Sequence, residues 1–256
     1  LSASAVYFTY DSTKESLMKS LKETSSLVAD KITQKINVYS ILAESAAVYK
    51  NSAGVSTLGL KSYLQKECSK YNLTKIDIID PSGNSVIDST SYLQDSTYKQ
   101  VQNGKAFLSD PIIINDEVFF DYACPYDNSV VIIRFPYSIL GEIIDDVKIG
   151  ETGSTYILNK DGAKVAHSDF SLVQKQQNNL EDVKTDSKTY GEVAALETAM
   201  TKGETGFGFY TWKGDRKFGA YTPIENTNGW SVNVTALQSE FMAEVQTAVI
   251  STIVLG

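Results

Sequence analysis

The residue with the strictest chemical requirement in this chain of 256 residues is Arg134. It follows four consecutive apolar residues, Val130 to Ile133, in a segment that is typical of a central β-strand. An arginine keeps its proton at every physiological pH, and burying it without an anion costs several kcal/mol. Arg134 therefore predicts a carboxylate close by, supplied by a ligand or by the protein itself.

Both sources of that carboxylate fit the sequence. In one interpretation, Arg134 forms an internal ion pair with Asp121 or Asp116 on the neighbouring strand, or reaches solvent. Alternatively, it binds a ligand carboxylate through two parallel N–H bonds, which the planar guanidinium suits. Because side chains alternate along a strand, Asp121 and Tyr122 face opposite sides, and only one of them can line the pocket. The candidate ligand-binding residues are Arg134, Tyr92, Tyr98, Ser109, Phe119, Asp121 and Tyr122.

The only histidine, His167, lies in the stretch YILNKDGAKVAHSD at 156–169, which predicts two short strands joined by a turn. An earlier segment, IDPSGNSVIDS at 79–89, aligns with LNKDGAKVAHS without a gap. Gly83 then matches Gly162, while Asp88 matches His167. Because the first copy has an aspartate there and no partner cluster lies near, we expect His167 to be structural or solvent-facing.

The repeat continues downstream of these two hairpins. VQNGKAFLSD corresponds to MTKGETGFGF, VFFDYACPY to RKFGAYTPI, and SVVIIRF to WSVNVTA. Each half is therefore predicted to contain a strand–turn–strand unit, a helical connection and three antiparallel strands, which indicates two copies of one α+β unit. Residues 1–50 contain no glycine or proline and carry one apolar stripe, which predicts a single long helix before the repeats.

Composition excludes several classes of function. The chain has 31 acidic and 23 basic residues, a net charge of −8, which argues against nucleic-acid binding. It contains no metal-binding motif, no G-x-S-x-G element and no histidine beside a nucleophile, so we expect no enzyme activity, no metal and no cofactor. Cys68 and Cys124 could pair, but we expect them to be unpaired core residues.

The order of these elements resembles the double Cache sensor domains of bacterial methyl-accepting chemotaxis receptors. IGETGSTYILNKDGAKVAHSD is similar to the entry of the membrane-proximal module of that family, and GFGFYTWKGDRKFGAYTPIENTNGWSVNV to its last three strands. The resemblance implies an α+β fold in which a long N-terminal helix packs along two stacked, PAS-like Cache modules, each with a central antiparallel sheet. It divides the chain into the helix (1–54), a membrane-distal module (55–140), a membrane-proximal module (141–236) and a C-terminal helix (237–256).

The resemblance further implies an extracytoplasmic sensor at the cell membrane, held between two transmembrane helices and dimeric in the full-length receptor. The apolar end TAVISTIVLG fits the start of a membrane-spanning segment, although a docked amphipathic tail would also account for it. The ligand is expected in the distal module, and a proximal pocket is expected to be smaller or filled. The alternatives are the sensor of a histidine kinase or cyclase, and an extracellular protein-binding or adhesion module.

The resemblance also bears on the ligand. Amino-acid-binding members carry an R-x-W-Y signature on the helical connection and an acid on the last distal strand. Here Tyr98 matches the signature tyrosine, but Asp95 and Thr97 replace its arginine and tryptophan, and Arg134 stands where the acid belongs. We therefore expect a small polar or carboxylate-bearing ligand, such as an organic acid, and not an α-amino acid.

Overall fold

The computed structural model describes residues 3–243, and these form two compact units. One unit contains Ile32–Leu140 with Asn226–Asn228, and the other contains 3–31, Gly141–Glu225 and 229–243. We call the sheet-containing parts of these units the first module and the second module. The expected C-terminal transmembrane segment falls within 244–256, outside the described residues. Among the helices of 3–243, none is both long enough and apolar enough to span a bilayer.

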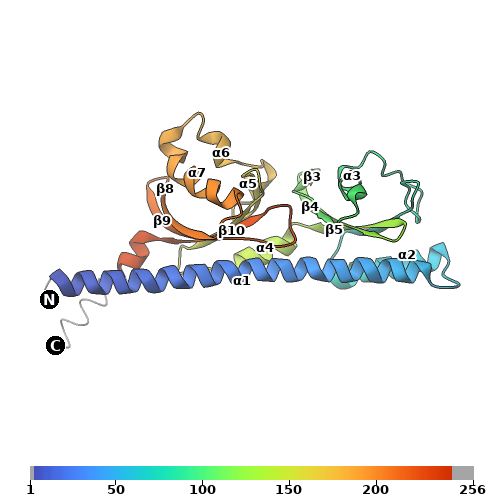
Figure 1. The fold of residues 1–256 in the computed structure, drawn as a ribbon, viewed down its shortest axis with the longest axis horizontal. Helices are drawn as coiled ribbons and strands as arrows, with labels where there is room; N and C mark the ends of the chain where they lie inside the picture. The colour runs from blue at the N-terminus through green and yellow to red at the C-terminus, as the bar shows by residue number, and fades with distance from the viewer. Residues whose placement is uncertain (1–2, 244–256) are drawn as a thin grey trace. The chain divides into compact units, whose positions relative to one another are not determined.

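The long N-terminal helix is present as α1, Ala3–Asn51, and α2, Thr57–Tyr71, follows it. Ser56 caps the start of α2 by accepting a hydrogen bond from Gly59 N–H, and Asn72 ends it in a left-handed conformation. Helix α1 contributes apolar residues to both units, among them Leu21 and Tyr39, which are 0% and 1% exposed. Figure 1 shows α1 as one uninterrupted helix.

The first module is built on a five-stranded antiparallel sheet in the order β1-β5-β4-β2, with β3 pairing to β4. Its strands are β1 (Lys75–Ile79), β2 (Phe107–Leu108), β3 (Ile112–Ile114), β4 (Glu117–Tyr126) and β5 (Ser129–Pro136). The helical connection contains α3 (Ser96–Gln100) and the short 3-10 helix η1 (Val101–Asn103), and α4 (Ser138–Asp145) follows β5.

The two faces of this sheet are covered by different elements. On one face, Tyr39 of α1 packs against Phe135, with ring centroids 4.8 Å apart, and Phe120 stacks on Phe135 at 5.3 Å. On the other face, Tyr98 of α3 joins Ile79 in an apolar cluster. Figure 1 shows α1 and α3 on opposite sides of β4 and β5.

The structure corrects the strand–turn–strand unit expected in the first half, because Val86–Ile87 form no return strand. Only isolated bridges pair this segment with its neighbours, Ile79 with Ser85 and Asn84 with Ser91. The cause is the Ser85 hydroxyl, whose oxygen accepts hydrogen bonds from Ile87 N–H and Asp88 N–H. Those bonds close a turn immediately after the bridge, in the way that serine side chains compete with strand pairing.

The second module repeats the architecture with a fully formed return strand. Its sheet has the order β7-β6-β10-β9-β8 and is antiparallel throughout. The strands are β6 (Ser154–Leu158), β7 (Lys164–His167), β8 (Gly206–Trp212), β9 (Asp215–Pro223) and β10 (Ser231–Leu237). The connection contains α5 (Phe170–Gln174), α6 (Asn179–Asp182) and α7 (Ser187–Thr201).

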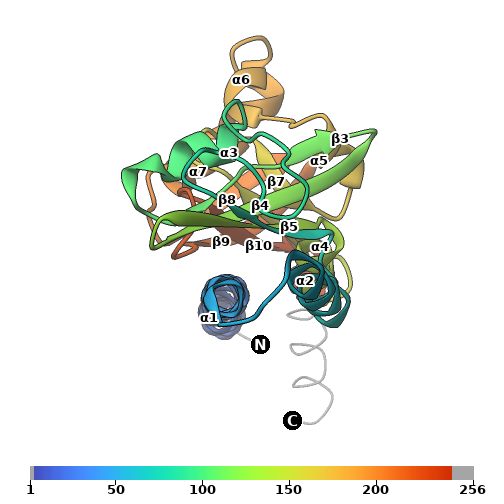
Figure 2. The same cartoon turned by 90° about the vertical axis from the view of Figure 1, so that its right-hand side faces the viewer.

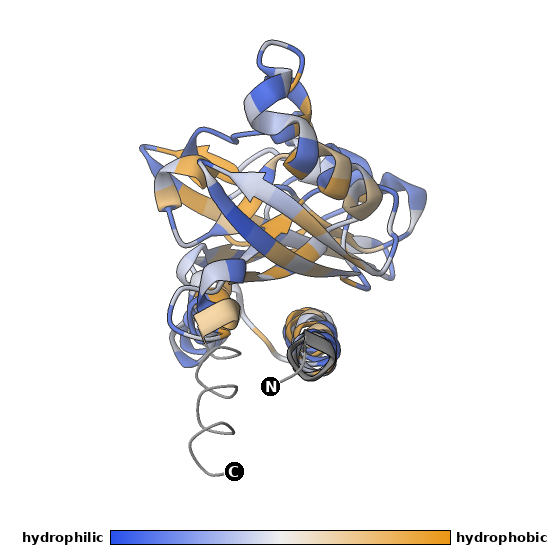
Figure 3. Ribbon diagram, turned by 90° about the vertical axis from the view of Figure 1, so that its left-hand side faces the viewer, coloured by the Kyte–Doolittle hydropathy of each residue, from blue (hydrophilic) through white to orange (hydrophobic). Residues whose placement is uncertain are grey.

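The core of the second module also has two sides. Ser25 of α1 shares a 2.8 Å hydrogen bond with Thr222 of β9, and Phe218 is fully buried. On the other face, Val193 and Met200 of α7 pack against the sheet. Figure 2 places α7 and α1 on opposite sides of β9 and β10, and Figure 3 shows that the strands carry hydrophilic as well as hydrophobic stretches.

Two separate antiparallel sheets, two helical connections and one long helix confirm the predicted α+β class. The pairing registers also agree between the modules. In the first, Arg134 lies opposite Lys75 on β1 and Asp121 on β4. In the second, Thr235 lies opposite Ser154 and Gly219. Strands β1, β5, β4 and β2 therefore share one frame with β6, β10, β9 and β8, and corresponding positions on them can be compared directly.

Candidate functional site

Arg134 of β5 and Asp121 of β4 form an ion pair with two hydrogen bonds. Arg134 Nε and Nη2 donate to Asp121 Oδ1 and Oδ2, both at 2.7 Å. The Asp121 side chain is 1% exposed and that of Arg134 25% exposed, so the acid is buried while the guanidinium reaches the surface. The hydrogen bond to Asp121 raises the pKa of Arg134. The pair uses two of the five N–H donors of the guanidinium, and three are left for another acceptor.

A second buried acid lies beside this pair. Lys75, directly opposite Arg134 in the sheet, contacts Asp77 Oδ2 at 2.8 Å and donates to the Tyr92 hydroxyl at 2.7 Å. Tyr92 donates in turn to Asp77 Oδ2 at 2.8 Å, and Ser85 donates to Asp77 Oδ1 at 2.7 Å. Burial lowers the pKa of Lys75, but its hydrogen bonds to Asp77 and Tyr92 outweigh that effect and raise it. Burial raises the pKa of Tyr92 to about 12.

Sequence reasoning missed Lys75 and Asp77. The available signal was the stretch KIDII at 75–79, in which polar residues interrupt a strand that is otherwise apolar. A charged residue at every second position places both side chains on one face.

The other predicted residues divide between the two faces of the sheet. Ser109 Oγ accepts a hydrogen bond from Asp121 N–H at 2.9 Å, which anchors the strand beneath the ion pair. Phe119 occupies the same face as Asp121, two residues before it. Tyr98 is 8% exposed and belongs to the apolar cluster against which Tyr92 packs. Ser109, Phe119, Tyr98 and Tyr92 therefore lie on the same side of the sheet as the Arg134–Asp121 pair.

Tyr122 does not join that group. Its ring lies 6.3 Å from the ring of Tyr39, on the face of the sheet that α1 covers. There it lines a groove of about 360 Å³ together with Ile36 and Ser40. Tyr122 therefore lies on the face of the sheet that α1 covers, and Asp121 and Arg134 lie on the opposite face.

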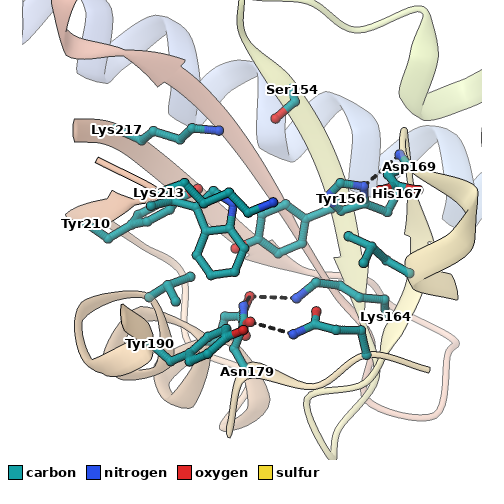
Figure 4. Close-up of a pocket in the computed structure, with 15 residues that line it drawn as sticks. Ser154, Tyr156, Lys164, His167, Asp169, Asn179, Tyr190, Tyr210, Lys213 and Lys217 are labelled. Carbon is teal, nitrogen blue, oxygen red and sulfur yellow. Dashed lines mark hydrogen bonds and ion pairs between the residues drawn. The ribbon is translucent and has the colours of Figure 1, made fainter. Parts of the chain in front are cut away.

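The second module contains a cavity of about 260 Å³ between its sheet and its helical connection. Aromatic side chains form much of its wall, and Figure 4 shows Lys164 extending from β7 toward the middle of the space. The sequence predicted a smaller or filled pocket in this module. The cavity is not filled. The first module has a groove of about 530 Å³ beside α2, but Arg134 does not line that groove, so the predicted difference in size stays a prediction.

The floor of this cavity is a buried ion pair. Lys164 Nζ lies 2.8 Å from Glu197 Oε1 of α7, and the two side chains are 4% and 0% exposed. Asn179 Nδ2 donates to the same carboxylate oxygen at 2.9 Å. The Lys164 ammonium also lies 4.8 Å from the centre of the Tyr156 ring. Glu197 Oε2 has no hydrogen-bond partner among residues 3–243.

His167 stands at the edge of the same cavity. Its ring lies 6.0 Å from that of Tyr156, and its Nδ1 accepts a hydrogen bond from Asp169 N–H at 2.8 Å. Burial, together with the positive charge of Lys164, lowers the pKa of His167 to about 4. The histidine is therefore neutral at pH 7 and is half-buried at the cavity.

Neither site has the ligands that a metal ion requires. Within residues 3–243, no three His, Cys, Asp or Glu side chains come close enough together to hold one. Cys68 and Cys124 are both free and half-buried. The polar groups of both sites are instead hydrogen-bond donors and acceptors suited to a small organic molecule.

The described residues form two α+β modules, each with polar groups between its sheet and its helical connection. The Cache domain model of the double Cache class matches residues 9–245, and this chain belongs to that family. Double Cache domains are extracytoplasmic sensor domains found in chemoreceptors and histidine kinases. No curated protein shows significant sequence similarity to the chain.

Several solved structures share the fold. The extracellular domain of mmHK1S-Z3, named as a histidine kinase, superimposes with a TM-score of 0.70 at 12% identity, covering 90% of this chain and 97% of that one. The ligand-binding domain of the Pseudomonas aeruginosa amino acid chemoreceptor PctB, in complex with L-Arg, gives 0.69 at 15% identity, covering 92% and 93%. That of Pseudomonas fluorescens CtaA, in complex with L-isoleucine, gives 0.68 at 17%, covering 91% and 98%.

Proposed function

We propose that this chain is the ligand-binding sensor domain of a transmembrane chemoreceptor of the methyl-accepting type. Its first module, residues 55–140, would be membrane-distal and would bind a small polar or carboxylate-bearing molecule. Residues 141–236 would form the membrane-proximal module, and 237–256 would lead into a transmembrane helix that carries the signal. Membership of the double Cache family and the chemoreceptor neighbours PctB and CtaA support this assignment.

The observation that carries the ligand assignment is the arrangement of charge around Arg134. The buried acid Asp121 holds the guanidinium by one edge, and its three remaining N–H donors are available on a side chain that solvent reaches. A carboxylate or another group rich in acceptors matches those donors. Lys75 lies directly opposite on β1, with a side chain 41% exposed, and adds a second cation to the same edge.

An α-amino acid would also need an acceptor for its ammonium group. Both oxygens of Asp121 already bind Arg134, and both oxygens of Asp77 are used by Lys75, Tyr92 and Ser85. An incoming ammonium would therefore compete with existing cations for each buried carboxylate. This competition favours an organic acid or a neutral molecule rich in acceptors over the α-amino acid ligands named for PctB and CtaA.

The most direct test compares ligand binding in wild type, Arg134→Lys and Arg134→Ala by titration calorimetry. Short-chain organic acids, pyrimidines and amino acids serve as probes, and Arg216→Ala, which changes the only other arginine, is the matched control. We expect a response to acids or pyrimidines that weakens by roughly 2–5 kcal/mol in Arg134→Ala, the range for losing one side of a buried charged contact. Arg134→Lys keeps the positive charge but loses the planar guanidinium that makes two parallel hydrogen bonds, so an intermediate affinity is expected.

Two outcomes would end the ligand assignment. One is a wild-type response confined to amino acids, and the other is full affinity in Arg134→Ala. A protein-binding or adhesion module, the third candidate, predicts no response to any small molecule. A histidine kinase or cyclase remains the second candidate because mmHK1S-Z3 shares the fold. Ligand-dependent methylation, measured on the full-length receptor, would favour the chemotaxis output over histidine phosphorylation.

We further propose that the full-length receptor is a homodimer that associates through α1. Val38, Ile41 and Val48 are 36%, 65% and 50% exposed, and their spacings of three and seven residues place them on one side of the helix. Such spacing matches the apolar seam of a coiled coil. Ile41→Glu should shift the receptor fragment toward monomer in light scattering, and an unchanged mass would count against this interface.

A further inference from the structure

The cavity of the second module has features that packing alone does not explain. Its buried ammonium, on Lys164, makes one hydrogen bond within residues 3–243, to Glu197, although an ammonium has three N–H donors. Figure 4 shows this ammonium pointing to the middle of the cavity. A lysine that is almost completely buried is rarely left with unused donors, because each costs desolvation energy. The unused donors indicate that the cavity suits a polar occupant.

The charge of the lining indicates what that occupant carries. Three lysines face the cavity, Lys164, Lys213 and Lys217, against two acids. One acid, Glu197, is already paired with Lys164. The other, Asp169, caps α5 by accepting from Ser171 N–H and is exposed. Two cations are therefore left without a matching acid in the lining, on a chain whose net charge is −8. A positively charged cavity in an acidic protein selects anions.

The walls indicate the shape of the occupant. Tyr190 and Trp212 lie with ring centroids 5.4 Å apart, and Tyr156 is stacked against His167 at 6.0 Å. Flat aromatic faces on two sides suit a flat, weakly polar body. A volume of about 260 Å³ limits that body to a small molecule.

We propose that the second module has its own ligand site in this cavity, and that the ligand is a small carboxylate with a flat, apolar body. The carboxylate is held by Lys164, Lys213 and Lys217, and the body lies against Tyr156, Tyr190 and Trp212. This site is independent of the one proposed at Arg134, since the two lie in different units and share no residue.

Benzoate is the probe, with neutral benzamide and cationic benzylamine as analogues of the same size. Lys164→Met is unsuitable as a first variant because it would leave Glu197 buried and unpaired. Lys213→Gln/Lys217→Gln is preferred, because Lys213 is exposed and Lys217 is only half-buried. Lys175→Gln/Lys202→Gln removes the same charge from two exposed lysines outside the cavity lining and serves as the matched control. Arg134→Ala reports on the first module.

By calorimetry and thermal shift, we expect wild type to bind benzoate more tightly than benzamide, and not to respond to benzylamine. The affinity for benzoate should fall tenfold or more in Lys213→Gln/Lys217→Gln, since each charge-assisted contact contributes this much. It should be unchanged in the control pair and in Arg134→Ala. The proposal is overturned if wild type does not bind benzoate, if benzylamine binds better, or if only Arg134→Ala loses binding. Failure here leaves the site at Arg134 unaffected.

Discussion

The two modules have the same strand frame but place their polar groups at different positions in it. In the first module, one row across the sheet reads Lys75, Arg134, Asp121. The corresponding row of the second reads Ser154, Thr235, Gly219, where two hydroxyls share a 3.0 Å hydrogen bond and no charge is present. The positions that carry charged side chains in the first module therefore carry small, uncharged residues in the second.

The next row on the same face also loses its charge, but its other two positions become more polar in the second module. In the first module it contains Asp77, Ile132 and Ala123, and in the second Tyr156, Asn233 and Tyr221. Asn233 donates to the Tyr156 hydroxyl at 2.8 Å. Its side chain lies so close to Gly219 that a Cβ there would lie 2.9 Å from Asn233 Oδ1.

The position of the buried charge differs accordingly. In the first module the charges belong to the strands β1, β4 and β5, whereas in the second Lys164 comes from β7 and Glu197 from α7. Ser85, which aligns with Lys164, donates instead to Asp77. The comparison teaches that the apolar strand positions maintain the fold, while each module has acquired its own polar site. Two sites on one fold can then recognise different molecules.

The substitution with the largest expected effect on stability is Lys164→Met. Glu197 is 0% exposed, so removing its cation leaves a buried carboxylate without a counter-charge. We expect the second module to lose about 3–5 kcal/mol of unfolding free energy, measured by urea denaturation. Lys164→Met/Glu197→Leu should recover most of that loss, because no uncompensated charge remains. A loss under about 1 kcal/mol in the single variant would show that solvent reaches the pair.

The corresponding change in the first module is Arg134→Met. Asp121 is as buried as Glu197, but the Arg134 side chain is 25% exposed and water can replace part of its contact. The expected loss is therefore smaller, about 2–3 kcal/mol. Arg216→Met, at an exposed position, should stay within about 0.5 kcal/mol of wild type. If the loss exceeded that of Lys164→Met, the proposed ranking of the two pairs would be wrong.

The sequence predicts features that depend on neighbouring residues better than features that depend on contacts between residues far apart in the chain. The repeat was predictable because Gly83 and Gly162, together with the apolar positions of each strand, are local signals. The Arg134–Asp121 pair was one of the alternatives that the sequence left open, beside a pair with Asp116, exposure to solvent and a ligand carboxylate. The site assigned to Arg134 remains a prediction.

Features that depend on how a helix docks were not predictable. Lys164 alternates with apolar residues in AKVAH and resembles a solvent-facing lysine, yet Glu197, 33 residues later, meets it inside the core. That contact depends on where α7 lies on the sheet. Likewise, alternation showed that Asp121 and Tyr122 face apart, but only the packing of α1 decides which face is covered.

The pH dependence of the second module should differ from that of the first because of His167. Its pKa of about 4 in the folded protein lies below its ordinary value of 6.5. Between those values the unfolded chain binds the proton and the folded chain does not, so stability falls as pH falls from 6.5 and levels off below about 4. Allowing for solvent around the half-buried ring, we expect about 1–2 kcal/mol lost between pH 7 and pH 5. His167→Asn should remove this dependence of the unfolding free energy on pH. If the dependence were unchanged in the variant, it would arise from the carboxylates and not from His167.

The smallest expected effect compares the two turn glycines, Gly83 and Gly162. Both have positive φ, +80° and +88°, so alanine at either position costs about 1 kcal/mol in backbone strain. A Cβ on Gly83 would meet the end of Leu93, which is 52% exposed and free to turn away. On Gly162 it would meet Leu180 at 2.7 Å and the Asn178 side chain that caps α6. Gly162→Ala should therefore lower the thermal midpoint more than Gly83→Ala. Equal shifts would mean that the α6 cap adjusts as readily as Leu93 does.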